Sequence, residues 1–335
     1  MVERAAELVE ISQPVTITPV AFGRPPRGRL RYWTAYWTTA RIVLSYLSLK
    51  VQARFRSPAA IDELSRKKHL RNARRVHRTI ARLQGLFIKI GQLISIMTNF
   101  LPEEFRAELE GLQDQVPPRP YVEVEQRFRE EFDKLPREMF AEFEERPIAS
   151  ASIGQVHRAT LPTGEKVAVK VQYPDIEEIV AIDLRALRRI FGVISWFVPY
   201  QGMEQLYREI RAMVLQELDF CGEADNVERI ASAFTHRTGV GFPKVRRELS
   251  TARILTTEWI DGVKVSDRAR LNALGVDRSK LARAVVHAYC QQIFSDGVYH
   301  ADPHPGNILV RKDATTGEVS IVFIDFGAVA EVSPK

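Results

Sequence analysis

The sequence predicts an α+β fold with two lobes, an antiparallel sheet in the first lobe, and a helical N-terminal extension. Two apolar alternations indicate strands: one ends at Lys170, and the other forms a hairpin of residues 307–310 and 319–324 around a polar turn. Helical periodicity in residues 101–113 and 122–132, on either side of a Pro-Pro break, indicates helices ahead of the sheet. With 335 residues and 45% apolar composition, the chain can form two domains with a proper core.

We expect four parts along the chain. They are a basic aromatic segment that faces a membrane at 1–60, a helical extension at 61–145, the small lobe at 146–262 and part of a large lobe at 263–335. Only eight residues follow Gly327, so we expect the large lobe to be truncated and the chain to be the front of a longer protein. The start of the chain carries three Glu and no apolar core, which argues against a signal peptide.

Positive charge is concentrated at the N-terminus. Residues 1–80 hold 16 Lys or Arg against 5 Asp or Glu, a net charge of +11, so the remaining residues carry −5 of the total of +6. Residues 29–56 combine Trp, Tyr, aliphatic residues and cations, which fits a helix lying on an anionic membrane surface. Arg41 interrupts the apolar run, which is too short to span a bilayer.

Two other interpretations of this basic segment remain open. Nucleic-acid binding by a basic aromatic patch is disfavoured, because no recognition module accompanies it. Docking on another part of the same protein is the structural alternative. The apolar run 190–200 is interpreted as a buried helix of the small lobe, because Pro199 lies at its end.

Residues 83–99 have the spacing of one amphipathic helix. Its apolar stripe consists of Leu83, Phe87, Ile90, Ile94 and Met97, and its polar stripe of Gly85, Lys89, Gln92 and Asn99. On spacing alone, the Lys and Gln of the polar stripe would face solvent.

A small-residue loop precedes the strand that ends at Lys170. Residues 147–159 contain one glycine, Gly154, where a protein kinase would have a glycine-rich loop. Small residues still allow a backbone to approach phosphates, but Ala and Ser adopt positive φ less cheaply than Gly. We therefore expect a nucleotide-binding loop of reduced pliability, formed by Ala149, Ser150, Ala151, Ser152, Ile153, Gly154 and Gln155.

Acidic residues cluster at 217–226. If this stretch is a single helix, Glu217 and Glu223 lie six residues and about 240° apart around its axis, so they cannot share a partner. Glu223 and Asn226 can share one. The alternative to a functional role is that Glu217, Asp219 and Glu223 lie on a solvent-exposed helix face.

The last forty residues have the pattern of a phosphoryl-transfer site. Asn307 opens one strand of the hairpin and Asp325 follows the other, so both lie at the same end and can face one metal ion. Asp302 lies five residues before the Asn in a proline-stiffened loop, where kinase-type enzymes place the carboxylate that accepts the substrate proton. The order Lys170, Asp302, Asn307, Asp325 is that of the kinase series, which implies ATP and Mg²⁺ as cofactors.

The histidines and cysteines do not indicate another metal site. His300 and His304 have the spacing of a helical zinc pair, but the prolines at 303 and 305 prevent that helix. We expect His300 to be structural and His304 to line the nucleotide site. Cys221 and Cys290 are too few for a disulfide framework or a metal cluster, and indicate a reducing compartment.

With these motifs, the chain resembles the AarF/UbiB family of atypical protein-kinase-like proteins from about residue 66 onward. The matching motifs are Ser-Ile-Gly-Gln-Val-His at 152–157, Lys-Ile-Gly-Gln at 89–92, Glu-Leu-Asp at 217–219 and Glu-Ala-Asp-Asn at 223–226. The resemblance implies a protein-kinase-like fold, in which Glu223 pairs with Lys170 and holds it on the α- and β-phosphates.

The resemblance also assigns roles to the remaining motif residues. It places the Lys-x-Gly-Gln helix over the mouth of the active site, where a protein substrate would otherwise enter, and Gly91 would allow close approach. Glu217 and Asp219 would then meet groups of the segment from Lys89 to Gln92. The resemblance therefore implies that the polar stripe of this helix faces the active site and not solvent.

The function expected from these features is that of an atypical kinase or ATPase, which supports isoprenoid-quinone or related lipid metabolism at a membrane. Expected partners are ATP, membrane lipids, polyprenyl-quinone intermediates and quinone-biosynthesis proteins, but no nucleic acid. The expected location is cytoplasmic and peripheral to a membrane, on the matrix or stromal side in an organelle. Two alternatives are a small-molecule phosphotransferase of the aminoglycoside or choline kinase type, and a non-enzymatic lipid-binding module switched by nucleotide.

Overall fold

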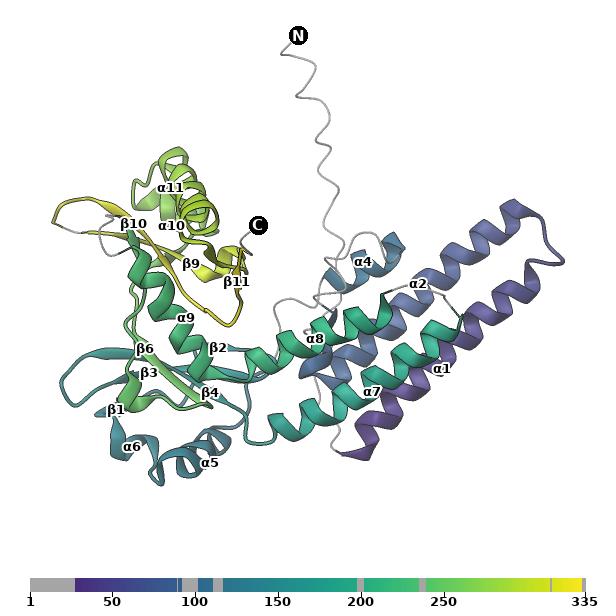
Figure 1. Cartoon of the computed structure of the whole chain (residues 1–335), viewed down its shortest axis with the longest axis horizontal. Helices are drawn as coiled ribbons and strands as arrows, with labels where there is room; N and C mark the ends of the chain where they lie inside the picture. Colours follow the sequence, from purple (N-terminus) through teal and green to yellow (C-terminus); the bar gives the residue numbers. More distant parts are fainter. Residues whose placement is uncertain are drawn as a thin grey trace, which may run out of the picture.

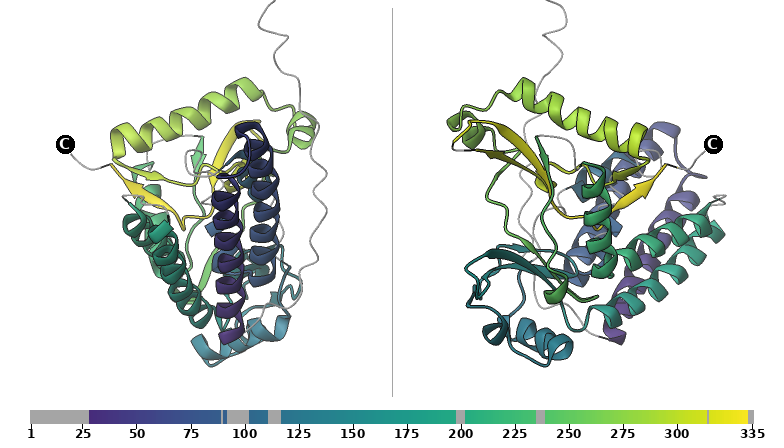
Figure 2. Two further views of the ribbon diagram at one scale, coloured as in Figure 1. Left: turned by 90° about the vertical axis from the view of Figure 1, so that its right-hand side faces the viewer. Right: turned by 60° about the vertical axis from the view of Figure 1, so that its left-hand side comes forward.

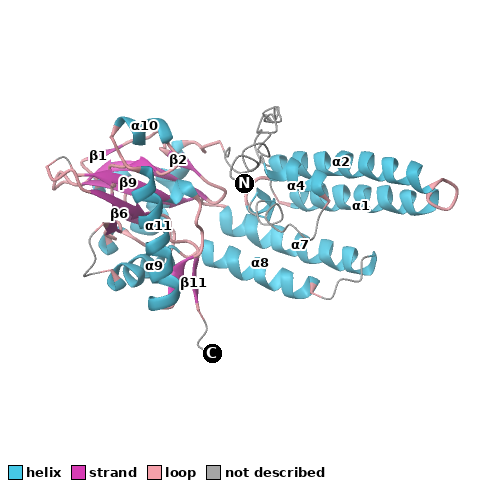
Figure 3. Cartoon of the chain, turned by 90° about the horizontal axis from the view of Figure 1, so that it is seen from above, coloured by secondary structure: helices cyan, strands magenta, loops and turns pink. Residues whose placement is uncertain are grey.

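The protein consists of a mixed body, with two larger sheets and a two-stranded sheet, and a helical body beside it (Figure 1). A computed structural model describes residues 28–88, 90–91, 102–110, 117–197, 202–234, 239–313 and 315–332. Seen from above, the sheets and the helical body lie side by side, and a helical hairpin projects away from the sheets (Figure 3).

The helical body includes five helices whose bounds are described. They are α1 (Arg29–Gln52), α2 (Pro58–Leu83), α4 (Glu103–Glu110), α7 (Ile176–Phe197) and α8 (Met203–Glu217). The first two form the projecting hairpin, and α7 packs between α1 and α8. Within the described ranges, no helix combines the length and apolarity required to cross a bilayer.

Residues 190–200 were expected to form a buried helix of the small lobe, and the predicted location was wrong. α7 lies in the helical body, and its residues Ile190, Phe191 and Val193 are half-buried. Packing against α1 and α8 explains why this stretch is apolar without lying under the small-lobe sheet. Pro199, which prompted the prediction, lies outside the described residues.

The small lobe has an antiparallel sheet with the strand order β1-β3-β4-β6, and β2 pairs with β3 beside this path. The strands are β1 (Glu142–Phe143), β2 (Ala149–Ser150), β3 (Gly154–Thr160), β4 (Lys166–Gln172) and β6 (Ile254–Glu258). One face of β4 presents buried valines to α5 (Tyr121–Phe132), and α6 (Pro136–Met139) follows that helix. Alternation along β4 therefore turns Lys170 toward the opposite face.

The large-lobe part has a second sheet with the order β5-β10-β9-β7, in which β5 is parallel to β10. Its strands are β5 (Val240–Gly241), β7 (Val263–Lys264), β9 (Ile308–Lys312) and β10 (Val319–Phe323). A separate pair joins β8 (Val298–His300) to β11 (Val329–Glu331). The helices are α10 (Arg268–Ala273) and α11 (Arg278–Gln291), which continues into a π-helical turn, Gln292–Asp296.

Helix α9 (Phe220–Ala233) connects the two lobes (Figure 2). Its first turn, with Phe220 and Ala224, packs in the core shared with the helical body. Its later residues Val227, Ile230 and Phe234 pack in the core of the large lobe. Glu223 lies at the junction of these two cores, so a side chain there can reach both lobes.

The prediction of one continuous amphipathic helix at 83–99 was wrong for the residues that the structure describes, 83–88 and 90–91. α2 ends at Leu83, and Gln84 and Gly85 both have positive φ, so the chain turns before residues 86–88 and 90–91 resume a helix. The described residues after the turn are buried on every side, including Gly91. Lys89, Gln92, Ile94, Met97 and Asn99 lie outside the described residues.

Candidate active site

Lys170 lies at the centre of the candidate site, where β4 faces α9. Its Nζ donates to the two carboxylate oxygens of Glu223 at 2.8 and 3.0 Å, and lies 3.4 Å from Oδ1 of Asp325. The Phe220 ring, at the start of α9, lies 4.9 Å from the same Nζ. These contacts join a strand, a helix and the segment after β10 at one cation.

Burial shapes the electrostatics of this cluster. It lowers the pKa of the Lys170 ammonium, but the Asp325 and Glu223 carboxylates outweigh it and raise that pKa above its ordinary value. Burial also raises the pKa of the Glu223 carboxyl, against the effect of its ion pair with Lys170. Lys170 therefore stays charged at physiological pH and can hold an anionic ligand.

The Asp-Phe-Gly segment is fixed to α9 by two hydrogen bonds. The Phe326 backbone N–H donates to Glu223 at 3.3 Å, and its carbonyl accepts from Asn226 at 3.2 Å. The predicted ability of Glu223 and Asn226 to share a partner is therefore confirmed. Phe326 is buried, and its ring meets the His300 ring edge-on at 5.1 Å.

Asp325 has a positive φ of 66°, an uncommon conformation for a residue other than glycine. Its carbonyl accepts from Nε2 of His300 at 2.7 Å, while His300 itself is buried. This contact anchors the backbone that presents the Asp325 carboxylate, which is 52% exposed. His300 thus has the structural role predicted for it.

The loop before β9 brings Asp302 and Asn307 together. Nδ2 of Asn307 donates to Oδ2 of Asp302 at 2.9 Å. The backbone N–H of Ile324 donates to the Asn307 carbonyl at 2.9 Å, which ties this loop to the strand that leads to Asp325. The hairpin of β9 and β10 therefore places Asn307 and Asp325 at one end of the sheet, as predicted.

These residues fit a hard cation. The exposed Asp325 carboxylate and the Asn307 amide oxygen are oxygen donors of the kind that Mg²⁺ prefers. Since Asn307 uses its amide nitrogen on Asp302, its oxygen is the atom that can serve as a ligand. Among the described residues, no group of three or more His, Cys, Asp or Glu is placed to hold a metal ion.

The small-residue loop is a tight hairpin between β2 and β3. Ala149 and Ala151 are exposed, Ser150 and Ser152 are half-buried, and Ile153, Gly154 and Gln155 are buried. A Cβ on Gly154 would lie 2.4 Å from the Val171 carbonyl oxygen, so this glycine is required for contact with β4. Contact of the loop with a nucleotide stays a prediction.

A hydrogen-bond chain explains the Gln and His of the Ser-Ile-Gly-Gln-Val-His motif. His157 is buried, and its Nδ1–H donates to the Glu144 carbonyl at 2.7 Å. The side-chain nitrogen of Gln155 donates to Nε2 of His157 at 3.0 Å, and its oxygen accepts from the Arg119 backbone N–H. Burial lowers the pKa of His157, which favours the neutral ring that this chain requires.

Sequence reasoning missed Tyr173, which supports the loop. The hydroxyls of Tyr173 and Ser150 lie 3.0 Å apart, and the Arg119 guanidinium stacks over the Tyr173 ring at 4.0 Å. The partners are separated by 23 and by 54 positions in the chain, so no local spacing indicates them.

Residues 217–226 do not form the single helix that was considered as a condition above. α8 ends at Glu217, and Asp219 is the N-cap of α9, accepting from the backbone N–H groups of Cys221 and Gly222 at 3.1 and 3.2 Å. An aspartate at this position starts a new helix because it satisfies the free N–H groups of the first turn. Glu217 raises the pKa of Lys170 together with the nearer carboxylates.

Comparison with known proteins agrees with this geometry. A profile of the ABC1 atypical kinase-like domain matches residues 111–335. The chain belongs to this family. The chain is 34% identical over 300 residues to AarF domain-containing protein kinase 1 of Gallus gallus, covering 90% of this chain and 58% of that protein. The resemblance to the AarF/UbiB family is thereby confirmed.

Two further relatives extend the comparison. Protein ACTIVITY OF BC1 COMPLEX KINASE 8, chloroplastic, of Arabidopsis thaliana is 37% identical over 325 residues, covering 92% of this chain and 42% of that protein. The structure of Rv3197 from Mycobacterium tuberculosis, solved with erythromycin, is 30% identical with a TM-score of 0.51, covering 81% of this chain and 68% of that one. The chain spans about half the length of the curated relatives it matches.

Proposed function

We propose that this protein binds Mg²⁺-ATP and either hydrolyses it or transfers its γ-phosphate. The observation that carries the proposal is the convergence at Lys170, which bonds to Glu223 on α9 and approaches Asp325 after β10. These groups come from three segments as far as 155 positions apart, and they are the groups that kinase-type phosphoryl transfer uses.

Each residue has a chemical role in this proposal. Lys170 holds the α- and β-phosphates, and Glu223 keeps the ammonium in place. Asp325 and Asn307 would hold Mg²⁺, which neutralises charge on the phosphates. Asp302 accepts the proton of the attacking hydroxyl or water.

The step itself exchanges one oxygen–phosphorus bond for another. The acceptor oxygen forms a bond to the γ-phosphorus, and the bond from that phosphorus to the bridging oxygen breaks, leaving its electron pair on ADP. The hydrogen bond that Asn307 donates to Asp302 fixes the orientation of the Asp302 carboxylate, which would accept the proton of the acceptor.

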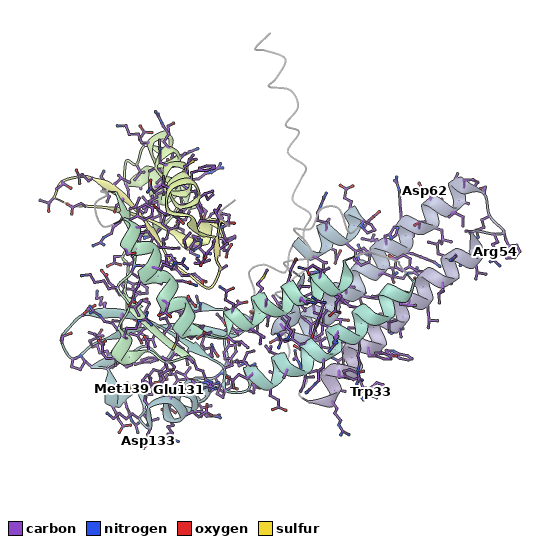
Figure 4. The ribbon with its side chains drawn as sticks, viewed as in Figure 1. Trp33, Arg54, Asp62, Glu131, Asp133 and Met139 are labelled. Carbon is purple, nitrogen blue, oxygen red and sulfur yellow. The ribbon has the colours of Figure 1, made fainter. Side chains whose placement is uncertain are left out.

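We further propose that the site works at a membrane, in isoprenoid-quinone or related lipid metabolism. An apolar stripe on α1 supports this part. Leu30, Trp33, Trp37, Leu44 and Val51 are exposed and fall within an arc of about 60° at 100° per residue. Five exposed cations flank them: Arg29, Arg41, Lys50, Arg54 and Arg56. Figure 4 shows Trp33 pointing away from the helical body and Arg54 at the tip of the hairpin.

One predicted membrane contact was wrong. The cations of residues 29–56 were expected to meet an anionic membrane surface, but the Arg31 side chain among them is 1% exposed and pairs with Asp183 of α7. The helical periodicity of α1 places Arg31 on the buried face and Trp33 and Trp37 on the exposed face.

An ATP turnover assay on the full chain tests the proposal. Its arms contain anionic liposomes, phenolic quinone precursors, or neither, with aminoglycoside and choline as competing acceptors. We expect Mg²⁺-dependent ADP release that rises with liposomes and phenol. Transfer to aminoglycoside or choline without lipid would instead indicate a small-molecule phosphotransferase, and binding without turnover would indicate a nucleotide-switched module.

A further inference from the structure

The turn that precedes the Lys-Ile-Gly-Gln motif is held by a buried arginine from a distant helix. Arg31 of α1 pairs with Asp183 of α7 through Nε at 3.0 Å and Nη2 at 2.5 Å. The same guanidinium donates to the carbonyls of Leu83 and Gln84, where α2 ends. One side chain therefore joins α1, α7 and the end of α2.

The backbone at this turn depends on that contact. Gln84 and Gly85 have φ values of 54° and 58°, so the helix is interrupted and its last carbonyls lack helical partners. A Cβ on Gly85 would lie 3.3 Å from Ile179 and 3.6 Å from Nη2 of Arg31. The turn is therefore packed directly against the ion pair, and the guanidinium replaces the missing N–H donors.

The residues after the turn lead to the candidate site. Leu86, Phe87, Ile88 and Ile90 share one apolar cluster with Ile153, at the end of the small-residue loop, and with Phe220 and Ala224, beside Glu223. Such cores are close-packed, so a displacement at the turn changes contacts throughout the cluster.

We propose that Arg31 and Asp183 are positioning residues that fix the start of the Lys-Ile-Gly-Gln segment and connect the seating of α1 to the candidate active site. α1 carries the exposed apolar stripe on its other face. A partner or membrane that binds this stripe and moves α1 would therefore also move the turn at Gln84 and Gly85 through the Arg31–Asp183 pair. The placement of the turn does not depend on the proposed ATP chemistry; only the activity readout below rests on it.

The decisive variant is Arg31→Met combined with Asp183→Asn. Removing one partner alone would leave an unpaired buried charge and destabilise the fold for that reason. The double variant leaves no such charge, yet it still lacks the donors that hold the carbonyls of Leu83 and Gln84. A matched control is Tyr32→Phe, which removes a hydrogen bond from Arg189 across the same α1–α7 interface without touching the turn.

Hydrogen exchange of the full chain, followed by mass spectrometry, gives the direct test. We expect amides of residues 84–91 to exchange at least tenfold faster in the double variant, with β3, β4 and α5 unchanged and Tyr32→Phe equal to wild type. Unchanged exchange at 84–91 would overturn the proposal. Equal acceleration along the whole chain would overturn it too, because it would assign the pair to overall stability.

ATP turnover supplies the second readout. If the pair positions the motif, the double variant should change kcat at least threefold while KM for MgATP stays constant, since Lys170 and its partners are untouched. A parallel loss of active fraction, with both constants unchanged per folded molecule, would contradict positioning. A wild-type protein without turnover would contradict the proposed function, while the exchange result would still decide the role of the pair.

Discussion

Asp183 shows how burial at a single residue makes stability depend on pH. Its carboxylate is 1% exposed, and burial raises its pKa from 3.8 to about 6, although Arg31 acts in the opposite direction. An acid whose pKa is higher in the folded state binds its proton more tightly there. The favourable contribution of protonated Asp183 to folding stability is therefore fully present below pH 3.8 and is lost as pH rises through about 6.

We therefore predict different pH profiles for wild type and Asp183→Asn. As pH rises from 4 to 7, the free energy of unfolding of wild type should fall relative to that of the variant, by about 3 kcal/mol for a shift of this size. Urea unfolding at a series of pH values measures the difference. The half-exposed Asp175→Asn is a control. Parallel profiles for wild type and Asp183→Asn would contradict burial as the cause.

Residue types with fixed chemical roles were predictable, whereas supporting contacts were not. The approach of Lys170 to Asp325, and of Asn307 to Asp302, could be anticipated because kinase-type sites carry those side chains in that order. Arg31 could not, since its partner lies 152 positions away and its neighbours in the sequence suggest a surface helix. Burial of an arginine depends on tertiary packing that no local pattern encodes.

At the scale of elements, the β2–β3 hairpin combines an exposed tip with a tightly packed base. Gly154→Ala should destabilise the protein by about 1–3 kcal/mol, because its Cβ would meet the Val171 backbone and force β3 away from β4. Thermal unfolding measures this. Ala151→Gly, three residues away on the exposed tip, serves as control and should change stability much less. Equal stability of Gly154→Ala and wild type would show that the strands are not in such close contact.

The exposed tip of the same hairpin should affect ligand binding instead. Ala149→Gly or Ala151→Gly should loosen the backbone near the phosphates and change the affinity for ATP or ADP several-fold, with the small lobe still folded. Calorimetric titration with both nucleotides tests this. Affinities equal to wild type in both variants would remove the loop from the nucleotide site.

Elements were predicted well where one periodicity dominated and poorly where a helix was interrupted. The β9–β10 hairpin and α5 agree with the sequence because their patterns are unbroken. The break at 84–85 was missed because the apolar spacing of Leu83, Phe87 and Ile90 continues through it. Positive φ at Gln84 and the N-cap at Asp219 are stabilised by Arg31 and by local backbone groups, which spacing does not reveal.

For the whole molecule, the charge and shape of the α1–α2 hairpin are the prominent features. Residues 29–83 hold 14 Lys or Arg and 2 Asp or Glu, a net charge of +12, on an arm that projects from the lobes (Figure 1). Such an arm attracts anionic surfaces within a Debye length of about 8 Å at physiological ionic strength. Exposed tryptophans on the same arm add an apolar contribution that salt does not screen.

We predict that the chain floats with anionic liposomes and that Trp33→Ala with Trp37→Ala weakens binding more than tenfold at every salt concentration. Each indole can bury about 200 Å² of surface, worth about 25 cal/mol per Å². Arg41→Gln should weaken binding only in low salt. Phe294→Ala, at an exposed apolar residue in the π-helical turn that follows α11, is the matched control. Binding that is equally weak to neutral and anionic vesicles, and unaffected by these changes, would make α1 an ordinary docking helix.

The central claim is that Asp325 binds the metal–nucleotide complex and Asp302 performs chemistry. Thermal unfolding with and without saturating MgATP, measured alongside turnover, separates the two roles most directly. At 100 times its Kd, MgATP should stabilise wild type and Asp302→Asn by about 2.7 kcal/mol. Turnover of Asp302→Asn should nevertheless fall by about 10²–10⁴-fold. Asp325→Asn should show no stabilisation, because the charged ligand is removed; a shift equal to that of wild type would contradict the assignment.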